Sequence, residues 1–348
     1  MRAMILKEFL ELRRDKRTLA MLIALPIVLL IIFGYAANFT ITDISTHVVG
    51  PQAEAVGRAL PPLFDVTEID PTATGQDAQD QVRDNEANVV IDTGTTPPTA
   101  YIDGSDLFTA QTASAALGRV GDRVTVDILY NPDLTTSWVM VPALVGLILT
   151  FIGTIVTSLG LVRERQSGTL EQLAVMPFRP SDVIVGKIAP YFILAALDMV
   201  VVTLLGVWIF GVPFNGSPLV FGVGAAIFLF VVLGVGVFIS TVSQTQGQAI
   251  QTAILFVMPQ ILLSGFIFPL SAMPAAIRWI GYCLPLTYFV QIAQGVMLRA
   301  APIASLWVPF VVITGMAIVV FTAAVLRFRR DLAPRQRREQ PAPEQAPA

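Results

Sequence analysis

Long apolar segments recur along the chain and are separated by short polar or charged segments. As a helix at about 1.5 Å per residue, an apolar segment of about 20 residues crosses a hydrocarbon core of about 30 Å. Gly, Pro, Asn and Ser residues punctuate the ends of these segments. The pattern predicts six membrane-spanning helices, at Leu19–Ala37, Trp138–Val162, Ile188–Gly211, Pro218–Val242, Ala249–Pro269 and Ile303–Leu326.

The first apolar segment has an alternative interpretation as a cleaved signal peptide, because Gly34-Tyr35-Ala36 resembles a small-x-small cleavage site. Its length exceeds the usual apolar region of about 7–15 residues, and a charged segment precedes it. We therefore expect Leu19–Ala37 to be retained as a span. Residues 1–18 place Ile5, Phe9 and Leu12 on one helical stripe, which predicts an amphipathic helix on the cytoplasmic membrane surface.

The segment from residue 38 to residue 137 has a different pattern, with short apolar runs between turn residues. Some runs are typical of strands and others of helices, which favours an α/β or α+β layered domain large enough to bury its own core. The expected strands are 47–49, 64–69, 89–91, 99–102 and 124–129, and the expected helices are 52–60, 76–85 and 107–121. The predicted fold class is an α-helical polytopic membrane protein of six spans with a small α/β external domain.

Two further segments break the pattern of long spans. Residues 271–301 are partly apolar but contain Pro274, Pro285, Arg278 and Arg299, so we expect short helices that dip into the outer interface or re-enter the bundle from outside. Residues 327–348 are rich in Arg, Gln, Glu, Pro and Ala, which predicts a disordered cytoplasmic tail.

Charge sets the predicted orientation. With the N-terminus inside, the predicted cytoplasmic segments contain 16 of the 22 Lys and Arg residues, and the predicted external segments contain 6. Residues 38–137 hold 15 of the 25 acidic residues. Because positive charge is concentrated on the cytoplasmic side, we expect a multi-pass protein of the cell (plasma or inner) membrane with both termini in the cytoplasm.

Composition excludes several classes of function. The chain is 54% hydrophobic and only 14% charged, unlike a soluble enzyme. A single cysteine, Cys283, permits no internal disulfide, and a single histidine, His47, cannot build a multi-histidine metal site. We expect His47 to be a structural surface residue at the start of a strand. Gly234-x-Gly236 lies within a span, where small residues allow close helix approach rather than nucleotide binding.

The predicted cytoplasmic loop, residues 163–187, has the pattern of a short amphipathic helix. Glu164 and Glu171 share one face, Leu170 and Leu173 lie on an apolar patch, and Pro177 follows the end of the helix. The alternative is a solvated linker whose charges only obey the positive-inside rule.

The same loop carries a resemblance to a known family. It reads Glu164-Arg165-x-x-Gly168-Thr169-Leu170-Glu171-x-Leu173, then Pro177 and Gly186-Lys187, and it resembles the coupling-helix loop of membrane (permease) subunits of type 2 ABC (ATP-binding-cassette) exporters. Three further motifs resemble that family: Asn131-Pro132-Asp133, Ser264–Pro269 and Leu284–Tyr288. The resemblance covers nearly the whole chain and is greatest to the subgroup with a large external domain between spans 1 and 2. Where that family often has an arginine, this chain has Gln294.

The resemblance implies a transport subunit that couples to a separate ATPase. The chain has no G-x-x-x-x-G-K-[ST] phosphate loop, so ATP and Mg would be used by a partner polypeptide, and this chain would bind no cofactor and catalyse no bond change. The implied partners are an ABC ATPase subunit, a second copy or a similar permease chain, and membrane lipids, with no nucleic acid. The ATPase-coupling residues would be Glu164, Arg165, Gly168, Thr169, Leu170, Glu171 and Leu173.

Polar residues within the spans are candidates for a pathway or for the bundle interior. Asp198 is the only charged residue inside a predicted span, where burial costs at least about 2.5–3.5 kcal/mol. It could attract a cationic substrate, carry a proton, or hydrogen-bond to a polar residue of another helix. We expect a polar stripe on the fifth predicted span to face the bundle interior, a partner chain or a water-filled pathway. Its side chains would either make packing contacts between helices or line the pathway. It comprises Gln248, Gln251, Thr252, Gln260 and Ser264.

Two alternatives to an exporter subunit remain open from the sequence. One is a membrane-embedded lipid-modifying or proteolytic enzyme, and the other is a non-transporting anchor that presents the external domain. No H-E-x-x-H, no G-x-S-x-G and no pair of intramembrane acids occurs, which weakens the enzyme interpretation.

Overall fold

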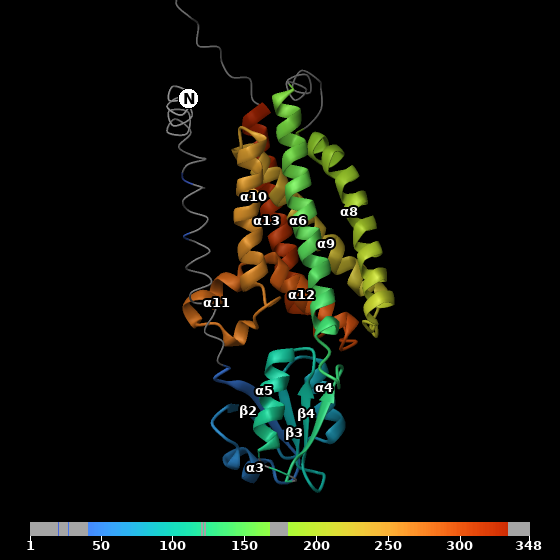
Figure 1. Ribbon diagram of the computed structural model, residues 1–348, viewed down its shortest axis with the longest axis vertical. Helices are drawn as coiled ribbons and strands as arrows, with labels where there is room; N and C mark the ends of the chain where they lie inside the picture. The colour runs from blue at the N-terminus through green and yellow to red at the C-terminus, as the bar shows by residue number, and fades with distance from the viewer. Residues whose placement is uncertain are drawn as a thin grey trace, which may run out of the picture.

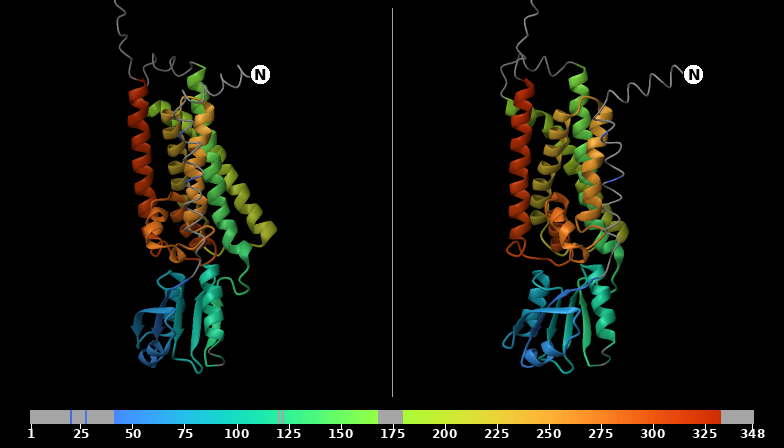
Figure 2. Two further views of the ribbon diagram at one scale, coloured as in Figure 1. Left: turned by 60° about the vertical axis from the view of Figure 1, so that its left-hand side comes forward. Right: turned by 90° about the vertical axis from the view of Figure 1, so that its left-hand side faces the viewer.

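The computed structural model describes residues 41–119, 121, 123–167 and 180–332, together with residues 20 and 27. A long helical bundle and a small sheet domain stack end to end, as Figures 1 and 2 show. The predicted surface helix 1–18, nearly all of the first predicted span and residues 333–348 lie outside the described residues.

The sheet domain contains five strands in the order β2-β1-β3-β4-β5. Strand β4 runs antiparallel to β3, and the other neighbouring pairs are parallel. The strands are β1 (Ile44–Val49), β2 (Phe64–Asp70), β3 (Val89–Asp92), β4 (Thr99–Asp103) and β5 (Thr125–Leu129). Each lies close to an expected strand.

Helices cover both faces of this sheet and bury two separate apolar clusters. Helices α3 (Ala53–Ala59) and α5 (Leu107–Gly118) pack on one face, around Ile91 and Ile102. Helix α4 (Gly75–Arg83) packs on the other, with Val82 against Val90. Strands whose side chains are buried on both faces require such a three-layer arrangement. The α/β layering expected from the sequence is therefore confirmed.

His47 departs from the sequence expectation. It lies within β1 and only 6% of it is exposed, because α4 covers its face of the sheet. Its Nδ1 lies 3.0 Å from Gln81 Oε1. The prediction of a surface position was wrong, since the strand begins three residues before the predicted start and continues under the helix.

The bundle is built from long apolar helices joined by short connections. Its long helices are α6 (Thr136–Gln166), α8 (Pro180–Phe210), α9 (Pro218–Val242), α10 (Gln246–Leu263) and α13 (Trp307–Leu332). A 3-10 turn η1 (Leu270–Ala272) and two short helices, α11 (Ala275–Tyr282) and α12 (Pro285–Met297), occupy the end nearest the sheet domain (Figure 1). The expectation of short helices in residues 271–301 is confirmed.

Four of the described helices are long and apolar enough to cross a membrane, namely Thr136–Gln166, Ile188–Phe210, Pro218–Val242 and Trp307–Arg327. The fifth predicted span corresponds to α10, which is not among them. It has 18 residues and carries four glutamines, so its apolar character is low. The first predicted span lies almost wholly outside the described residues, and a total of six spans stays a prediction.

Several predicted boundaries were wrong. Helix α13 begins at Trp307 rather than Ile303, and the predicted loop 163–187 is shorter, because α6 continues to Gln166 and α8 begins at Pro180. Helix α10 ends at Leu263 rather than Pro269, because the chain bends there and Gly265 adopts a positive φ of 87°. Helix α13 continues to Leu332, beyond the predicted start of the tail at residue 327. The arginines at its end are compatible with a helix, because cations near a helix C-terminus interact favourably with its dipole.

Helix α9 is the centre of the bundle. It packs against α6 and α13, and Phe228 stacks on Phe289 of α12 with ring centroids 4.6 Å apart. A Cβ at Gly236 would lie 2.9 Å from the Cβ of Thr157 on α6, so only glycine fits this close approach. The expectation that Gly234-x-Gly236 allows close helix packing is therefore confirmed.

Candidate functional site

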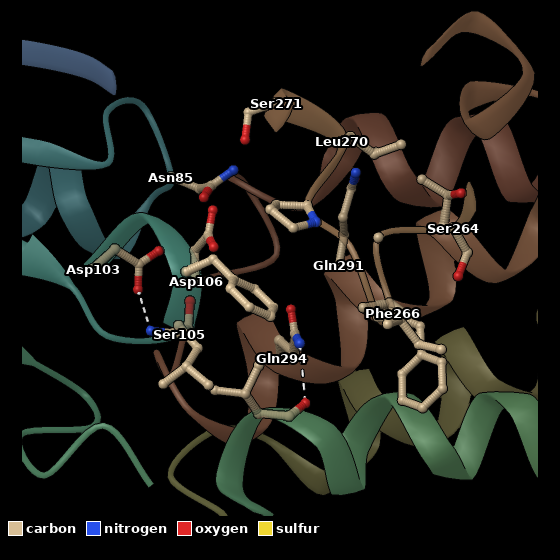
Figure 3. A pocket seen from close by; sticks show the side chains of 18 of the residues that line it. Asn85, Asp103, Ser105, Asp106, Ser264, Phe266, Leu270, Ser271, Gln291 and Gln294 are labelled. Carbon is tan, nitrogen blue, oxygen red and sulfur yellow. Dashed lines mark hydrogen bonds between the residues drawn. The ribbon is translucent and has the colours of Figure 1, made fainter. Parts of the chain in front are cut away.

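A cavity of about 420 Å³ lies where the sheet domain meets the bundle. In Figure 3, Asn85, Asp103, Ser105 and Asp106 of the sheet domain face the helical side, which contributes residues such as Gln291 and Gln294. The N-terminal end of α6 lines the cavity through Thr136, Val139 and Met140, and its C-terminal end lies about 46 Å away, because the helix has 31 residues with a rise of about 1.5 Å each.

Arg299, in the connection between α12 and α13, joins the two domains at this cavity. It is 7% exposed, and its Nη1 donates to Asp103 Oδ2 (3.1 Å), Asn85 Oδ1 (3.2 Å) and Ser105 Oγ (3.0 Å). All three acceptors belong to the sheet domain. Because Asp103 is also buried, the ion pair has little contact with water and must be satisfied locally.

Local backbone structure positions the acceptors of Arg299. Asn85 follows α4 with a φ of 62°, and the bonds from Asn85 N to Val82 O and from Glu86 N to Gln81 O form a Schellman motif. Asparagine tolerates this left-handed position and presents its amide to the junction. At the end of β4, Asp103 Oδ1 accepts from the backbone N of Ser105 at 2.8 Å, an Asx turn that fixes both side chains.

The Asn131-Pro132-Asp133 motif forms a second connection between the domains. Asn131 is fully buried, and its Nδ2 donates to Gly104 O (3.3 Å) and to Thr135 O (3.2 Å). Its Oδ1 accepts from Thr135 N at 2.8 Å. One side chain therefore holds the turn after β4 against the first residues of α6.

Asp106 is the second carboxylate at the cavity, and it caps the N-terminus of α5. Its carboxylate oxygens accept from Thr109 N (3.3 Å) and Thr109 Oγ1 (2.7 Å). Burial raises the pKa of Asp106, and Asp103 adds to the increase, while the hydrogen bonds to Thr109 and the charge of Arg299 oppose it. Burial also raises the pKa of Tyr130 to about 12.

The helical side of the cavity contributes amide and hydroxyl groups. Gln294 donates from Nε2 to Val139 O (3.1 Å) and so links α12 to α6. Ser264, on the bend after α10, is 1% exposed, and its Oγ has no hydrogen-bond partner among the described residues. Of the predicted polar stripe, Ser264 is the residue that lines the cavity.

Three other residues of that stripe make hydrogen bonds with the backbone, and one of them, Gln260, joins α10 to α12 in this way. Gln260 is fully buried, and its Oε1 accepts from Leu286 N at 3.2 Å. That N–H belongs to the first turn of α12, where no acceptor exists within the helix. Gln248 accepts from Gln244 N (3.0 Å), and Thr252 donates to Gln248 O (2.8 Å).

Two predicted intramembrane residues lack the partners that the sequence led us to expect. Asp198 lies on α8, and its Oδ2 is buried without a hydrogen-bond partner among the described residues. Gln251 Oε1 is also buried without a hydrogen-bond partner among the described residues. Neither residue lines the cavity. The structure therefore separates Asp198 from Ser264 rather than gathering the predicted polar groups in one site.

Of the predicted ATPase-coupling residues, Glu164 and Arg165 lie in the last turn of α6. Arg165 Nη1 donates to Ser240 O (2.9 Å) and Ser243 O (3.3 Å) and so stabilises the C-terminal end of α9. Gln166 hydrogen-bonds to the connection between α9 and α10: its Nε2 donates to Gln244 O, and its Oε1 accepts from Gln246 Nε2. Gly168, Thr169, Leu170, Glu171 and Leu173 lie outside the described residues.

Sequence reasoning missed the junction between the domains. Arg299 and Asp103 are 196 positions apart, and no local pattern relates them. The available signal was a lone arginine within an apolar segment, which requires a partner. Within the described part of the chain, no cluster of three or more His, Cys, Asp or Glu side chains could hold a metal. The arrangement is suited to binding.

Comparison with known proteins places these features in context. The family described as "ABC-2 family transporter protein" matches residues 16–326. "Probable multidrug ABC transporter permease YbhR" of Escherichia coli (strain K12) is 31% identical, over 94% of this chain and 98% of that protein. YbhS of the same strain, with the same description, is 29% identical over 93% of each chain. "Inner membrane transport permease YhhJ" of that strain is 32% identical over 58% of this chain and 54% of its own length.

Proposed function

The chain belongs to the ABC-2 transporter family and is a multi-pass membrane transport subunit of an ABC transporter, and we propose that it forms the translocation pathway of an ATP-driven exporter. A separate ATPase polypeptide would bind and hydrolyse ATP with Mg. The observation that carries the proposal is the match of one transporter family to 16–326, together with a bundle of long apolar helices in the same residues.

The coupling end of the bundle supports a mechanical role for the loop that follows α6. Arg165 and Gln166 hydrogen-bond to the ends of α9 and α10, so α6, α9 and α10 are joined at one point. Force applied to the loop segment 168–177 would reach all three helices together. We infer that an ATPase subunit docks there through Glu164, Glu171 and the neighbouring apolar residues, and that its closure on ATP changes the bundle between inward-open and outward-open states.

The exposed apolar surface supports assembly of two permease chains. Only 17% of the most apolar window of α8 and of α13 is buried, against 61% for α9. Leu197, Leu204 and Trp208 on α8 are each more than half exposed. In a membrane, lipid or a second copy of the chain, or a similar one, would cover these faces. We propose a dimer of permease chains above two ATPase subunits, in the inner membrane, with both termini cytoplasmic.

Co-purification with the ATPase subunit tests this assignment. We expect Glu171→Lys to insert and fold normally but to retain less ATPase subunit, because a lysine would repel a basic docking groove. Glu54→Lys makes the same charge change on α3, where the side chain is 68% exposed, and it should retain the ATPase fully. Equal retention by both variants would contradict docking at this loop.

A further inference from the structure

The cavity at the domain junction carries more negative than positive charge. Its lining contains two carboxylates, Asp103 and Asp106, and one guanidinium, that of Arg299. Arg299 is neutralised by Asp103 at 3.1 Å. The carboxylate of Asp106 has hydrogen bonds from Thr109 but no ion pair among the described residues. A positive charge in the cavity would therefore balance Asp106, whereas an anion would face an excess of negative charge.

About half of the residues that line the cavity are polar or charged, and the rest form an apolar and aromatic part of its wall. Phe108 is 46% exposed, Tyr282 is 47% exposed, and Phe266, Leu270 and Met140 complete this surface. Aromatic faces stabilise a cation that is brought close to them. The volume, about 420 Å³, lies within the range of about 300–1,000 Å³ that is usual for sites of drug-sized ligands.

Buried polar atoms that point to a ligand also lie at this cavity. Ser264 Oγ and Arg299 Nε are both buried and have no hydrogen-bond partner in the described part of the chain. Both residues are more than nine-tenths buried and both line the cavity. Buried polar groups are rarely left without a partner, because each costs about 1–3 kcal/mol. Water held in the cavity beside a bound molecule, or oxygen or nitrogen atoms of that molecule where it has them, would satisfy them.

We propose that this cavity binds an amphipathic organic cation, whose charged group lies at Asp106 and whose apolar body lies against Phe108, Phe266 and Tyr282. The inference rests on the proposed function in one respect: that function makes the cavity an exit-side site, because the cavity lies at the opposite end of α6 from the proposed coupling loop. Binding itself needs neither ATP nor the ATPase subunit.

Equilibrium binding to the purified full-length chain in nanodiscs tests the proposal, with tetraphenylphosphonium as the cation and tetraphenylborate as an anion of matched shape. We expect saturable binding of the cation alone at pH 8. Asp106→Asn should weaken it by about tenfold, because asparagine remains a good N-cap for α5 but carries no charge. Phe108→Ala should weaken it too. Asp65→Asn, an exposed position on β2, is the matched control and should bind as the unmodified chain does.

The pH dependence provides a second measurement. The charged groups that face Asp106 are Asp103 and Arg299, and the balance of burial and charge raises the pKa of Asp106. Protonation on acidification should therefore weaken cation binding in the unmodified chain but not in Asp106→Asn. Equal binding by the two proteins at pH 8, or equal affinity for the cation and the anion, would overturn the proposal. Binding without ATP-driven transport would contradict only the proposed function, and transport without binding would contradict only this inference.

Discussion

At the scale of single residues, Arg299 is surrounded by several buried hydrogen-bond acceptors. Its Nη1 carries two hydrogens but lies within hydrogen-bonding distance of three acceptors, Asp103, Asn85 and Ser105, so one hydrogen is shared. Breaking a buried ion pair by removing one partner costs about 3–5 kcal/mol, because the other charge stays buried and uncompensated. The main role of Arg299 is therefore to compensate the buried charge of Asp103, and its contribution to net stability is secondary.

The first prediction concerns this ion pair. We expect Arg299→Met to lower the thermal unfolding midpoint of the detergent-solubilised chain and to expose the sheet domain to protease. Asp103→Asn combined with Arg299→Met should recover part of the loss, because asparagine removes the buried charge and still accepts from Ser105 N. A double variant no more stable than Arg299→Met alone would show that Arg299 does not act through the charge of Asp103.

At the scale of elements, α10 shows how two glutamines on one helix differ in their effect. Gln260 Oε1 accepts from the backbone of α12, although its Nε2 has no partner among the described residues, whereas Gln251 Oε1 is itself buried without a partner there. The sequence showed one polar stripe and did not distinguish the two. Their difference depends on where the N-terminus of α12 lies, which is a tertiary relation.

The second prediction compares these positions. Gln260→Leu should destabilise the chain by about 1–3 kcal/mol, because Leu286 N loses its acceptor and stays buried. Gln251→Leu should be neutral or stabilising, since leucine removes an unsatisfied buried oxygen. Thermal unfolding of the two variants in the same detergent makes the comparison. Equal destabilisation would contradict the assigned role of Gln260.

The same scale shows what the sequence could predict. The strands and helices of the α/β domain lay close to their expected positions, because alternation and turn residues such as Asp103-Gly104 are local signals. The end of α10 at Leu263 was missed because apolar residues continue to Pro269 while the backbone bends. The cavity was not predicted, because Arg299, Asp106 and Ser264 come from three separate elements that only the packed structure brings together.

At the scale of the whole molecule, the proposed orientation places the sheet domain and α11 outside the cell. Cys283, the only cysteine in the sequence, is exposed at the C-terminal end of α11, a helix at the end of the bundle nearest the sheet domain (Figure 1). Ser167 is exposed at the opposite end of the bundle, directly after α6. These two positions therefore report on the two sides of the membrane.

The third prediction uses them. A membrane-impermeant maleimide should label the unmodified chain in intact cells, at Cys283. It should label the double variant, which combines Cys283→Ser and Ser167→Cys, only after the cells are opened. The reverse pattern would invert the orientation and remove the argument for coupling at the loop after α6.

Transport in reconstituted vesicles tests the central claim most directly. The chain is reconstituted with its ATPase subunit, and uptake of tetraphenylphosphonium into vesicles is followed for the complexes that expose the ATPase to the outer solution. The account predicts uptake that requires ATP, that is abolished when the phosphate-loop lysine of the ATPase is replaced, and that is strongly reduced by Glu171→Lys. Docking of the ATPase without ATP-dependent movement of this cation or any other compound offered would contradict a translocation pathway and would favour a membrane anchor.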